Sequence, residues 1–192
     1  MEIIIIGITS YLAGSIPFGL ILTRIFLNKD IRKIGSGNIG ATNALRTGNK
    51  FLGYSTLSLD ILKAVIPVLY VKFNIPELLY VAAISAFLGH VFPIWLKFKG
   101  GKGVATYIGI LFSLNIVLGL VFVVCWLITF IVSRFSSLAS LIGSLSIPIY
   151  IFFIDSKENV IFFGIMFILI FFTHRENIKR LKNKEETKTK IY

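Results

Sequence analysis

Long apolar runs separated by short polar segments restrict the fold of this chain more than any other feature. Of its 192 residues, 56% are hydrophobic and only 15% are charged, so it holds more apolar side chains than one soluble core needs. A helix that crosses about 30 Å of hydrocarbon needs about 20 mostly apolar residues. We therefore predict an all-α integral membrane protein, a bundle of seven transmembrane helices at residues 3–23, 53–71, 78–96, 104–114, 116–132, 138–154 and 160–173.

The two short central spans come from one apolar stretch, 104–132, which suits either one overlong helix or two helices broken near 113–115. Basic residues favour the break, because Lys and Arg concentrate in short cytoplasmic loops. Seven spans with the N-terminus outside place nearly all of the basic residues, and the C-terminus, on the cytoplasmic side. The exceptions are Lys63, Lys72 and Lys157.

The two ends of the chain favour one retained membrane domain. The first apolar run lacks a basic start, carries Glu2 instead and is followed by Arg24, which favours an uncleaved first span over a signal peptide. Pro17 and its neighbouring glycines predict close helix packing and a kink within that span. Residues 176–192 are expected to form a polar, solvated cytoplasmic tail. We predict a single transmembrane domain over residues 1–192.

Two glycine-rich polar stretches interrupt the apolar runs, GSGNIGATN at 35–43 and KFKGGKG at 97–103. Glycines allow backbone N–H groups to converge, and hydroxyls, amides and cations bind phosphate oxygens. Arg46 adds a planar guanidinium suited to two phosphate oxygens. Lys102 lies between two glycines just before an apolar helix, whose N-terminus also attracts anions.

Two further polar segments, SRFSSLAS at 133–140 and HREN at 174–177, fall on the same predicted cytoplasmic face. Four connections can therefore converge on one phosphate-binding pocket. The structural alternative for the loop at 35–46 is a turn whose polar side chains cap neighbouring helices.

Several ionisable residues lie within or beside the predicted spans. Burying the ionisable His90 ring inside the third span costs free energy. His90 is therefore expected either to bind a ligand or to form a hydrogen bond with another helix. Asp60 and Lys63 are three residues apart, so an internal ion pair is expected. His174 and Asn177 have the same spacing and would share one face if the last helix continued past them.

Three other functions are disfavoured. Gly35, Gly37 and Gly40 spell G-x-G-x-x-G, but a dinucleotide site requires a βαβ unit, which membrane spans exclude. The net charge of +11 reflects the cytoplasmic bias of basic residues, so no nucleic-acid partner is expected. With the single Cys125 and no cluster at metal-ligand spacing, we expect no metal and no other cofactor.

Spaced motifs run through nearly the whole chain: GSIPFG at 14–19, GSGNIGATNALR at 35–46, LDILK at 59–63, GH at 89–90, FKGGKGVAT at 98–106, SRFSSLAS at 133–140 and HREN at 174–177. In this order they closely resemble the PlsY family of bacterial membrane glycerol-3-phosphate acyltransferases. The resemblance implies transfer of a fatty acyl group from acyl phosphate to the 1-hydroxyl of sn-glycerol 3-phosphate, releasing lysophosphatidic acid and inorganic phosphate. It also implies a multi-pass protein of the bacterial inner membrane, surrounded by membrane lipids, with a cytoplasmic active site and coupling to the enzyme that makes acyl phosphate.

The resemblance further implies the residues of the pocket. The catalytic residues would be Ser36, Arg46, Lys102, Ser140, His174 and Asn177. The supporting substrate-binding residues would be Gly37, Asn38, Gly40, Thr42, Asn43, His90, Gly100, Gly101, Gly103, Thr106, Arg134 and Ser137. Ser137 and Ser140 are alternatives for the same role.

The sequence is consistent with an acyl donor that is already chemically activated. An H-x-x-x-x-D pair, in which an aspartate orients a histidine base, is missing, because Trp95 and Lys179 stand where the aspartate would follow each histidine. Acyl phosphate is a mixed anhydride, so holding two phosphates and stabilising the oxyanion would suffice. A substrate phosphate or His174 would accept the hydroxyl proton.

The alternative function is a small membrane transporter of a phosphorylated or anionic solute. It is disfavoured because the sequence has no inverted repeat and few polar residues in the extracellular half.

Overall fold

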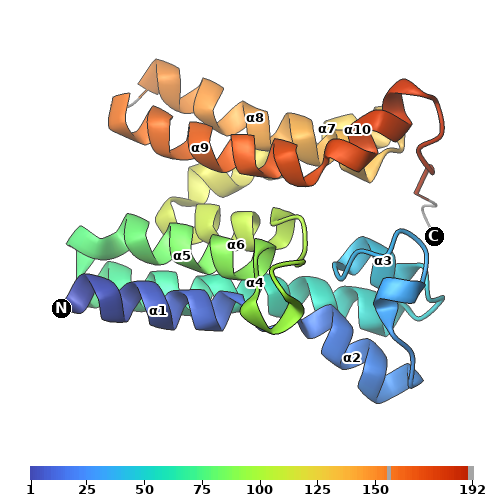
Figure 1. The fold of residues 1–192 in the computed structure, drawn as a ribbon. Helices are drawn as coiled ribbons and strands as arrows, with labels where there is room; N and C mark the ends of the chain where they lie inside the picture. The colour runs from blue at the N-terminus through green and yellow to red at the C-terminus, as the bar shows by residue number, and fades with distance from the viewer. Residues whose placement is uncertain (155–156, 190–192) are drawn as a thin grey trace. The chain divides into compact units, whose positions relative to one another are not determined.

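The computed structural model describes residues 1–154 and 157–189, and all regular secondary structure within these ranges is helical (Figure 1). The chain divides into two compact units, an N-terminal unit, Met1–Leu114, and a C-terminal unit, Asn115–Tyr192. Residues 190–192 of the predicted polar tail lie outside the described residues.

Six α-helices and three short 3-10 helices make up the N-terminal unit. They are α1 (Glu2–Gly14), α2 (Phe18–Leu27), η1 (Ile31–Lys33), α3 (Ala41–Leu45), α4 (Lys50–Asn74), η2 (Pro76–Leu78), α5 (Leu79–Val91), η3 (Ile94–Leu96) and α6 (Val104–Leu114). Helix α1 packs against α5 and α4, and α4 packs against α6, while α2 and α3 gather at one end of α4 (Figure 1).

Glycines bring the main helices of this unit into backbone contact. A Cβ on Gly14 would overlap the carbonyl of Ala86, and a Cβ on Gly89 would overlap the carbonyl of Tyr11, so α1 and α5 approach closely. Similarly, a Cβ on Gly109 of α6 would lie 2.6 Å from the carbonyl oxygen of Ile61 in α4, so these two helices also approach closely. Small residues at helix contacts are typical of packing in membranes, where burial from water does not drive association.

The first expected span, 3–23, is interrupted, in agreement with the kink predicted at Pro17. Helix α1 ends at Gly14 and α2 begins at Phe18. Proline has no N–H to donate, and the carbonyl of Ile16 at the break accepts a hydrogen bond of 2.6 Å from Lys63 Nζ. A lysine of α4 therefore satisfies a backbone group that the helix break exposes.

The apolar stretch 104–132 is also broken, as predicted. Helix α6 ends at Leu114, and α7 (Ile116–Ser133) begins after Asn115. The Asn115 side chain accepts a 2.8 Å hydrogen bond from the N–H of Val117, so it caps the new helix.

The C-terminal unit consists of α7, α8 (Ser136–Ile154), α9 (Lys157–Thr173) and α10 (Arg175–Lys182). Helix α8 packs against both α7 and α9, and α10 contacts α8 and α9 (Figure 1). Helices α9 and α10 are bent by 61° at His174. The last helix therefore does not continue straight through the HREN segment.

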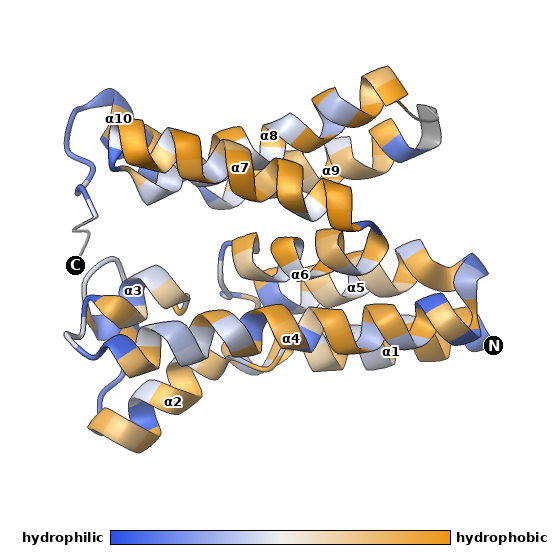
Figure 2. Ribbon diagram, turned by 180° about the vertical axis from the view of Figure 1, so that it is seen from behind, coloured by the Kyte–Doolittle hydropathy of each residue, from blue (hydrophilic) through white to orange (hydrophobic). Residues whose placement is uncertain are grey.

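Many large apolar side chains of the helices are exposed. Figure 2 shows hydrophilic residues in the segment between α2 and α4 and in the tail after α10. Exposed apolar surface of this extent indicates contact with lipid. In the part of the chain that the structure describes, four stretches are long and apolar enough to cross a membrane, and the bent pair α9–α10 would make a fifth. The four are Glu2–Leu27, Pro76–Leu96, Ile116–Ser133 and Ser136–Ile154.

Two of the seven expected spans are not among the stretches that are long and apolar enough to cross a membrane. Helix α6 has 11 residues and so extends about 16 Å, roughly half the hydrocarbon thickness. Helix α4 has 25 residues but carries Asp60, Lys63 and Lys72 within its apolar sequence. The fold is thus a helical membrane fold with four to five clear spans.

Candidate active site

One buried amide organises the first glycine-rich loop. The Nδ2 of Asn43 lies 2.8–3.1 Å from the carbonyl oxygens of Ile31, Ile34 and Asn38, and its Oδ1 accepts a 3.0 Å hydrogen bond from the N–H of Ser36. Asn43 is only 2% exposed. The structure therefore places this predicted binding residue inside the loop, where it holds the backbone.

The other polar residues of this loop lie at its surface. Ser36, Thr42 and Arg46 are exposed, and Asn38 is half-buried. Gly35 and Gly37 have φ angles of 54° and 72°, which favour glycine, and a Cβ on Gly35 would lie 3.0 Å from Cδ of Arg46. The Arg46 stem therefore runs beside the glycine turn, next to Ser36.

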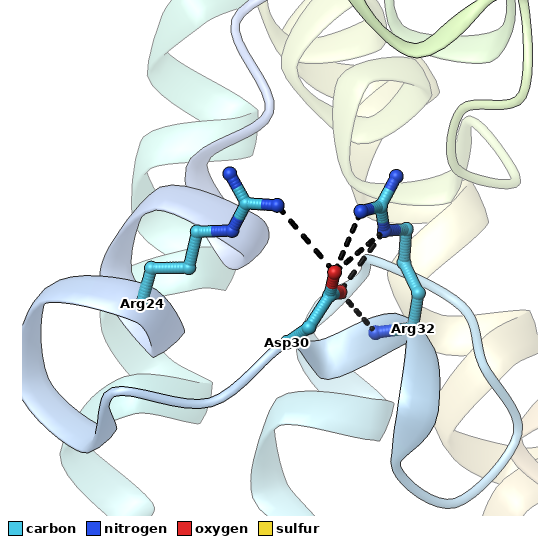
Figure 3. Close-up of polar contacts among 3 residues, drawn as sticks. All are labelled: Arg24, Asp30 and Arg32. Atoms are coloured by element: carbon cyan, nitrogen blue, oxygen red, sulfur yellow. Dashed lines mark hydrogen bonds and ion pairs between the residues drawn. The ribbon is translucent and has the colours of Figure 1, made fainter.

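An ion pair network shapes the segment that leads into the loop. The Asp30 carboxylate accepts hydrogen bonds from Nε and Nη2 of Arg32 at 2.9 and 2.6 Å, and Arg24 approaches it at 3.4 Å (Figure 3). Asp30 Oδ1 also accepts a 3.0 Å hydrogen bond from the N–H of Arg32, capping η1. The hydrogen bonds from Arg32 hold the pKa of Asp30 well below its usual range.

The second glycine-rich loop folds back along the end of α5. The N–H groups of Gly100 and Gly101 each donate a 3.1 Å hydrogen bond, to the carbonyls of Val91 and His90 respectively. A Cβ on Gly101 would overlap the ring of His90, and one on Gly103 would overlap the ring of Phe87. The loop backbone therefore rests directly on two rings of α5.

Lys102 is half-buried between these two glycines and immediately precedes α6. Thr106, another predicted binding residue, is fully buried and donates a 2.8 Å hydrogen bond to the carbonyl of Gly103. Lys97 and Lys99 of the same loop are exposed. Lys102 thus differs from its neighbouring lysines in being held in place at the start of a helix, where anions are favoured.

Beneath this loop lies a buried charged group. Lys63 Nζ and Asp60 Oδ1 are 2.7 Å apart, which confirms the expected internal ion pair. His90 Nδ1 is 3.9 Å from the same carboxylate oxygen, and His90 is 4% exposed. His90 therefore lies under the glycines rather than on the surface of the loop.

The C-terminal unit brings two predicted residues together around a third that was not predicted. Ser137 Oγ and Asn177 Nδ2 each donate a 2.7 Å hydrogen bond to Oε1 of Glu186, and Arg180 Nε lies 2.6 Å from Oε2. The Glu186 side chain is 7% exposed, whereas the sequence predicts a solvated tail. Its isolated position in a polar tail gives no periodic or motif signal, so sequence reasoning missed both Glu186 and Arg180.

The charge of Glu186 is maintained by its donors. Burial alone would raise the pKa of this carboxyl, but hydrogen bonds from Ser137, Asn177 and Arg180, with the positive charge of Arg180, lower it. The tail is also attached through its backbone, because the N–H of Thr189 donates a 2.9 Å hydrogen bond to the carbonyl of Arg134. Arg134 is exposed. These donors form a site that holds an anionic group.

The two serines of α8 have different partners. Ser140 Oγ donates to the carbonyl of Ser136 at 2.8 Å and lies 3.3 Å from Nε1 of Trp126. Ser137 instead shares Glu186 with Asn177. Within this unit, Ser137 is the serine that lies beside Asn177.

His174 occupies the bend between α9 and α10 and is 2% exposed. Its Nδ1 lies 2.8 Å from the carbonyl oxygen of Ile170, which can only accept, so Nδ1 carries the proton. In the neutral ring, Nε2 is then the unprotonated nitrogen. Arg175 and Glu176 are exposed, while Asn177 is buried near the start of α10.

Each unit therefore presents groups suited to anions. The N-terminal unit has the exposed Ser36 and Arg46 and the loop that holds Lys102, and the C-terminal unit has the donors around Glu186 together with His174.

Known proteins share this combination of sequence and fold. A family model described as glycerol-3-phosphate acyltransferase matches residues 4–184. A glycerol-3-phosphate acyltransferase of Pelagibacter ubique is 72% identical over 192 residues, covering 100% of both chains. One from Rhodopseudomonas palustris strain BisB5 is 50% identical over 182 residues, covering 94% of this chain and 93% of that protein.

Two solved structures of PlsY, an integral membrane glycerol 3-phosphate acyltransferase, have the same fold. The glycerol 3-phosphate form is 36% identical with a TM-score of 0.91, and the lysophosphatidic acid form is 35% identical with a TM-score of 0.88. Each comparison covers 99% of this chain and 96% of that one. The chain belongs to the PlsY family of integral membrane glycerol-3-phosphate acyltransferases.

Proposed function

We propose that this glycerol-3-phosphate acyltransferase takes its acyl group from acyl phosphate and transfers it to the 1-hydroxyl of sn-glycerol 3-phosphate. The products are lysophosphatidic acid and inorganic phosphate, so the reaction is the first acylation of phospholipid synthesis. The observation that carries the proposal is Lys102, half-buried between two glycines at the start of α6. An ammonium, loop N–H groups and a helix N-terminus in one place suit a phosphate group.

The proposed phosphate-binding residues belong to a single acyltransferase domain. In the N-terminal unit, Lys102, Arg46 and Ser36 would bind phosphate oxygens with a cation, a guanidinium fork and a hydroxyl. In the C-terminal unit, the proposed residues are His174, Asn177 and either Ser137 or Ser140. The carboxylate that Ser137 and Asn177 hold in this structure supports their role, because carboxylate and phosphate oxygens accept the same donors.

The acyl transfer requires little from the protein beyond binding the two substrates. The substrate hydroxyl oxygen attacks the acyl carbonyl carbon, and the bond from that carbon to the phosphate oxygen breaks to release inorganic phosphate. The mixed anhydride is already activated, so fixing both phosphates and stabilising the developing oxyanion supply the main acceleration. Lys102 and Arg46 provide the positive charge for both tasks.

Two groups are candidates to accept the hydroxyl proton, a substrate phosphate and His174. The hydrogen bond from Nδ1 of His174 to the carbonyl of Ile170 leaves Nε2 as the unprotonated nitrogen, the form that a base requires. Turnover of His174→Gln separates the alternatives, since near-full activity would assign the proton to a substrate phosphate.

A membrane location suits an acyl donor whose chain stays in hydrocarbon. We propose seven spans in the bacterial inner membrane, with the N-terminus outside, the C-terminus in the cytoplasm and the pocket at the cytoplasmic face. In this arrangement α4 and α6 cross the bilayer although their charge or length departs from an ordinary span. The enzyme that makes acyl phosphate could then deliver it from the same side.

The proposal is tested with purified protein in lipid, long-chain acyl phosphate and glycerol 3-phosphate, by following phosphate release and lysophosphatidic acid. We expect product from acyl phosphate and none from acyl-CoA. Lys102→Ala should lower turnover by about 100-fold or more, because a preorganised charge at the reacting group is removed. Lys99→Ala is the matched control, as Lys99 is an exposed lysine of the same loop. Equal loss in both variants, or turnover of acyl-CoA alone, would contradict the proposal.

A further inference from the structure

Both glycines that flank Lys102 rest on α5, and one of them rests on a buried histidine. The three atoms nearest to a Cβ on Gly101 are Nε2, Cε1 and Cδ2 of His90, and the N–H of Gly101 donates to the carbonyl of that same residue. The position of the Gly101 backbone is therefore set by the orientation of the His90 ring.

The His90 ring in turn faces a buried carboxylate. Its Nδ1 is 3.9 Å from Oδ1 of Asp60, which is too far for a hydrogen bond, but at this distance the carboxylate charge still attracts the N–H dipole of a neutral ring. Among the residues that the structure describes, Nδ1 has no hydrogen-bond partner. The carboxylate therefore favours the tautomer with the proton on Nδ1, which leaves Nε2 as the acceptor on the side of Gly101.

Lys63 completes the group and connects it to the break between α1 and α2. Its Nζ lies 2.7 Å from Asp60 Oδ1 and donates a 2.6 Å hydrogen bond to the carbonyl of Ile16. Asp60 and Lys63 are 2% and 5% exposed, so both charges have been removed from water. A buried pair contributes little net stability compared with apolar residues of similar volume, which points to a purpose other than stability.

We propose that Asp60, Lys63 and His90 are positioning residues for the phosphate loop. Lys63 neutralises and holds the Asp60 carboxylate, the carboxylate orients the His90 ring, and the ring sets the position of Gly101 and hence of Lys102. His90 acts from beneath the loop and does not touch the substrate. The inference rests on the proposed phosphate site at Lys102.

The first test removes both charges together, so that neither is left unpaired. In Asp60→Asn/Lys63→Met, the full-length protein keeps side chains of similar volume, and its melting temperature should stay near that of the wild type. Its Kd and KM for glycerol 3-phosphate should rise by about tenfold or more, and kcat should fall as well, because displaced loop atoms weaken both phosphate binding and stabilisation of the oxyanion. Inorganic phosphate serves as a second probe of the same Kd.

The matched control is Lys72→Met. Lys72 is another lysine of α4 that donates to backbone carbonyls, those of Ser113 and Leu114, but it contacts neither His90 nor the loop. It should leave Kd and KM unchanged. An equal rise in both proteins, or an unchanged Kd in the double variant while the wild type binds and turns over, would overturn the inference and leave the proposed function standing.

The second test does not depend on the charged pair. Gly101→Ala adds a methyl group that overlaps the His90 ring, and His90→Ala removes that ring. The effects of the two substitutions on binding should therefore be coupled. We expect His90→Ala/Gly101→Ala to bind glycerol 3-phosphate at least threefold better than the product of the single effects predicts. Strictly additive effects would overturn the inference. A wild type that neither binds phosphate nor turns over would refute the proposed function and this inference with it.

Discussion

A single amide can set the shape of a loop when the loop turns around it. Asn43 uses both ends of its side chain, with Nδ2 near three carbonyls and Oδ1 accepting from Ser36, and it is almost fully buried. Buried backbone groups that lose such partners are left unsatisfied. Asn43 therefore supports the exposed Ser36 and Arg46 from inside the loop.

We expect Asn43→Ala to lower the free energy of unfolding by roughly 2 kcal/mol or more, because three carbonyls lose a donor and the N–H of Ser36 loses its acceptor. Asn43→Asp should be similarly harmful, since it keeps the acceptor but loses both donors. The measurement is the denaturation midpoint of the purified protein. Asn74→Ala is the control, as this exposed amide donates to the carbonyl of Tyr70 within its own helix. A midpoint for Asn43→Ala equal to that of the control would refute this role.

At the scale of helices, the α1–α5 interface depends on glycine in some positions and only tolerates it in others. A Cβ on Gly89 would overlap the carbonyl of Tyr11, which is backbone and cannot move aside. A Cβ on Gly7 would lie 3.7 Å from Oγ of Ser85, an ordinary contact. The two glycines lie at the same interface and so form a matched pair.

Gly89→Ala should destabilise the protein by about 1–3 kcal/mol through overpacking. Gly7→Ala should be neutral or stabilise it by about 0.5–1 kcal/mol, because alanine loses less conformational entropy in a helix. Thermal unfolding in one detergent measures both. If the two substitutions changed the stability of the protein equally, the α1–α5 interface would not require glycine at position 89.

The tail attachment through Glu186 should depend on pH. Its lowered pKa means that the carboxylate stabilises the attached tail above its unfolded pKa, and that this is lost as the pH falls through the folded value. Glu186→Gln should release the tail even at neutral pH, seen as faster hydrogen exchange at the Thr189 amide after correction for intrinsic rate. Glu185→Gln, the exposed neighbour, should not. Unchanged protection in Glu186→Gln would mean that the backbone bond to Arg134 alone holds the tail.

Hydropathy predicted most helices because each apolar run must be buried in lipid. The run 104–132 shows this well, since the polar Asn115 caps α7 where the break was expected. The expected span 78–96 ran past the end of α5 at Val91, although Pro93 follows closely and proline ends a helix. What no local pattern predicts is that Gly100 and Gly101 donate to the last carbonyls of α5 across a loop. Glu186 was missed for a similar reason, as its partners are distant in sequence and leave no local pattern.

For the whole molecule, the direction of the chain in the membrane is what the proposed function depends on most. The loops at 35–46 and 97–106, the turn near Arg134 and the segment from His174 must all face one compartment. An odd number of spans places the two termini on opposite sides, whereas an even number would bring them to the same side. Helices α4 and α6 decide this count, since α6 is short and α4 carries charged residues within its apolar sequence.

Single cysteines introduced into a Cys125→Ser background can measure this orientation in sealed cells with a membrane-impermeant maleimide. We expect Glu2→Cys and Asn74→Cys, both at exposed positions, to be labelled from outside. Lys33→Cys and Lys184→Cys, also exposed, should be labelled only after permeabilisation, because basic loops stay in the cytoplasm. Labelling of Lys184→Cys from outside would mean that one of the short or charged helices does not cross, and would place the HREN segment on the side away from the cytoplasmic substrates.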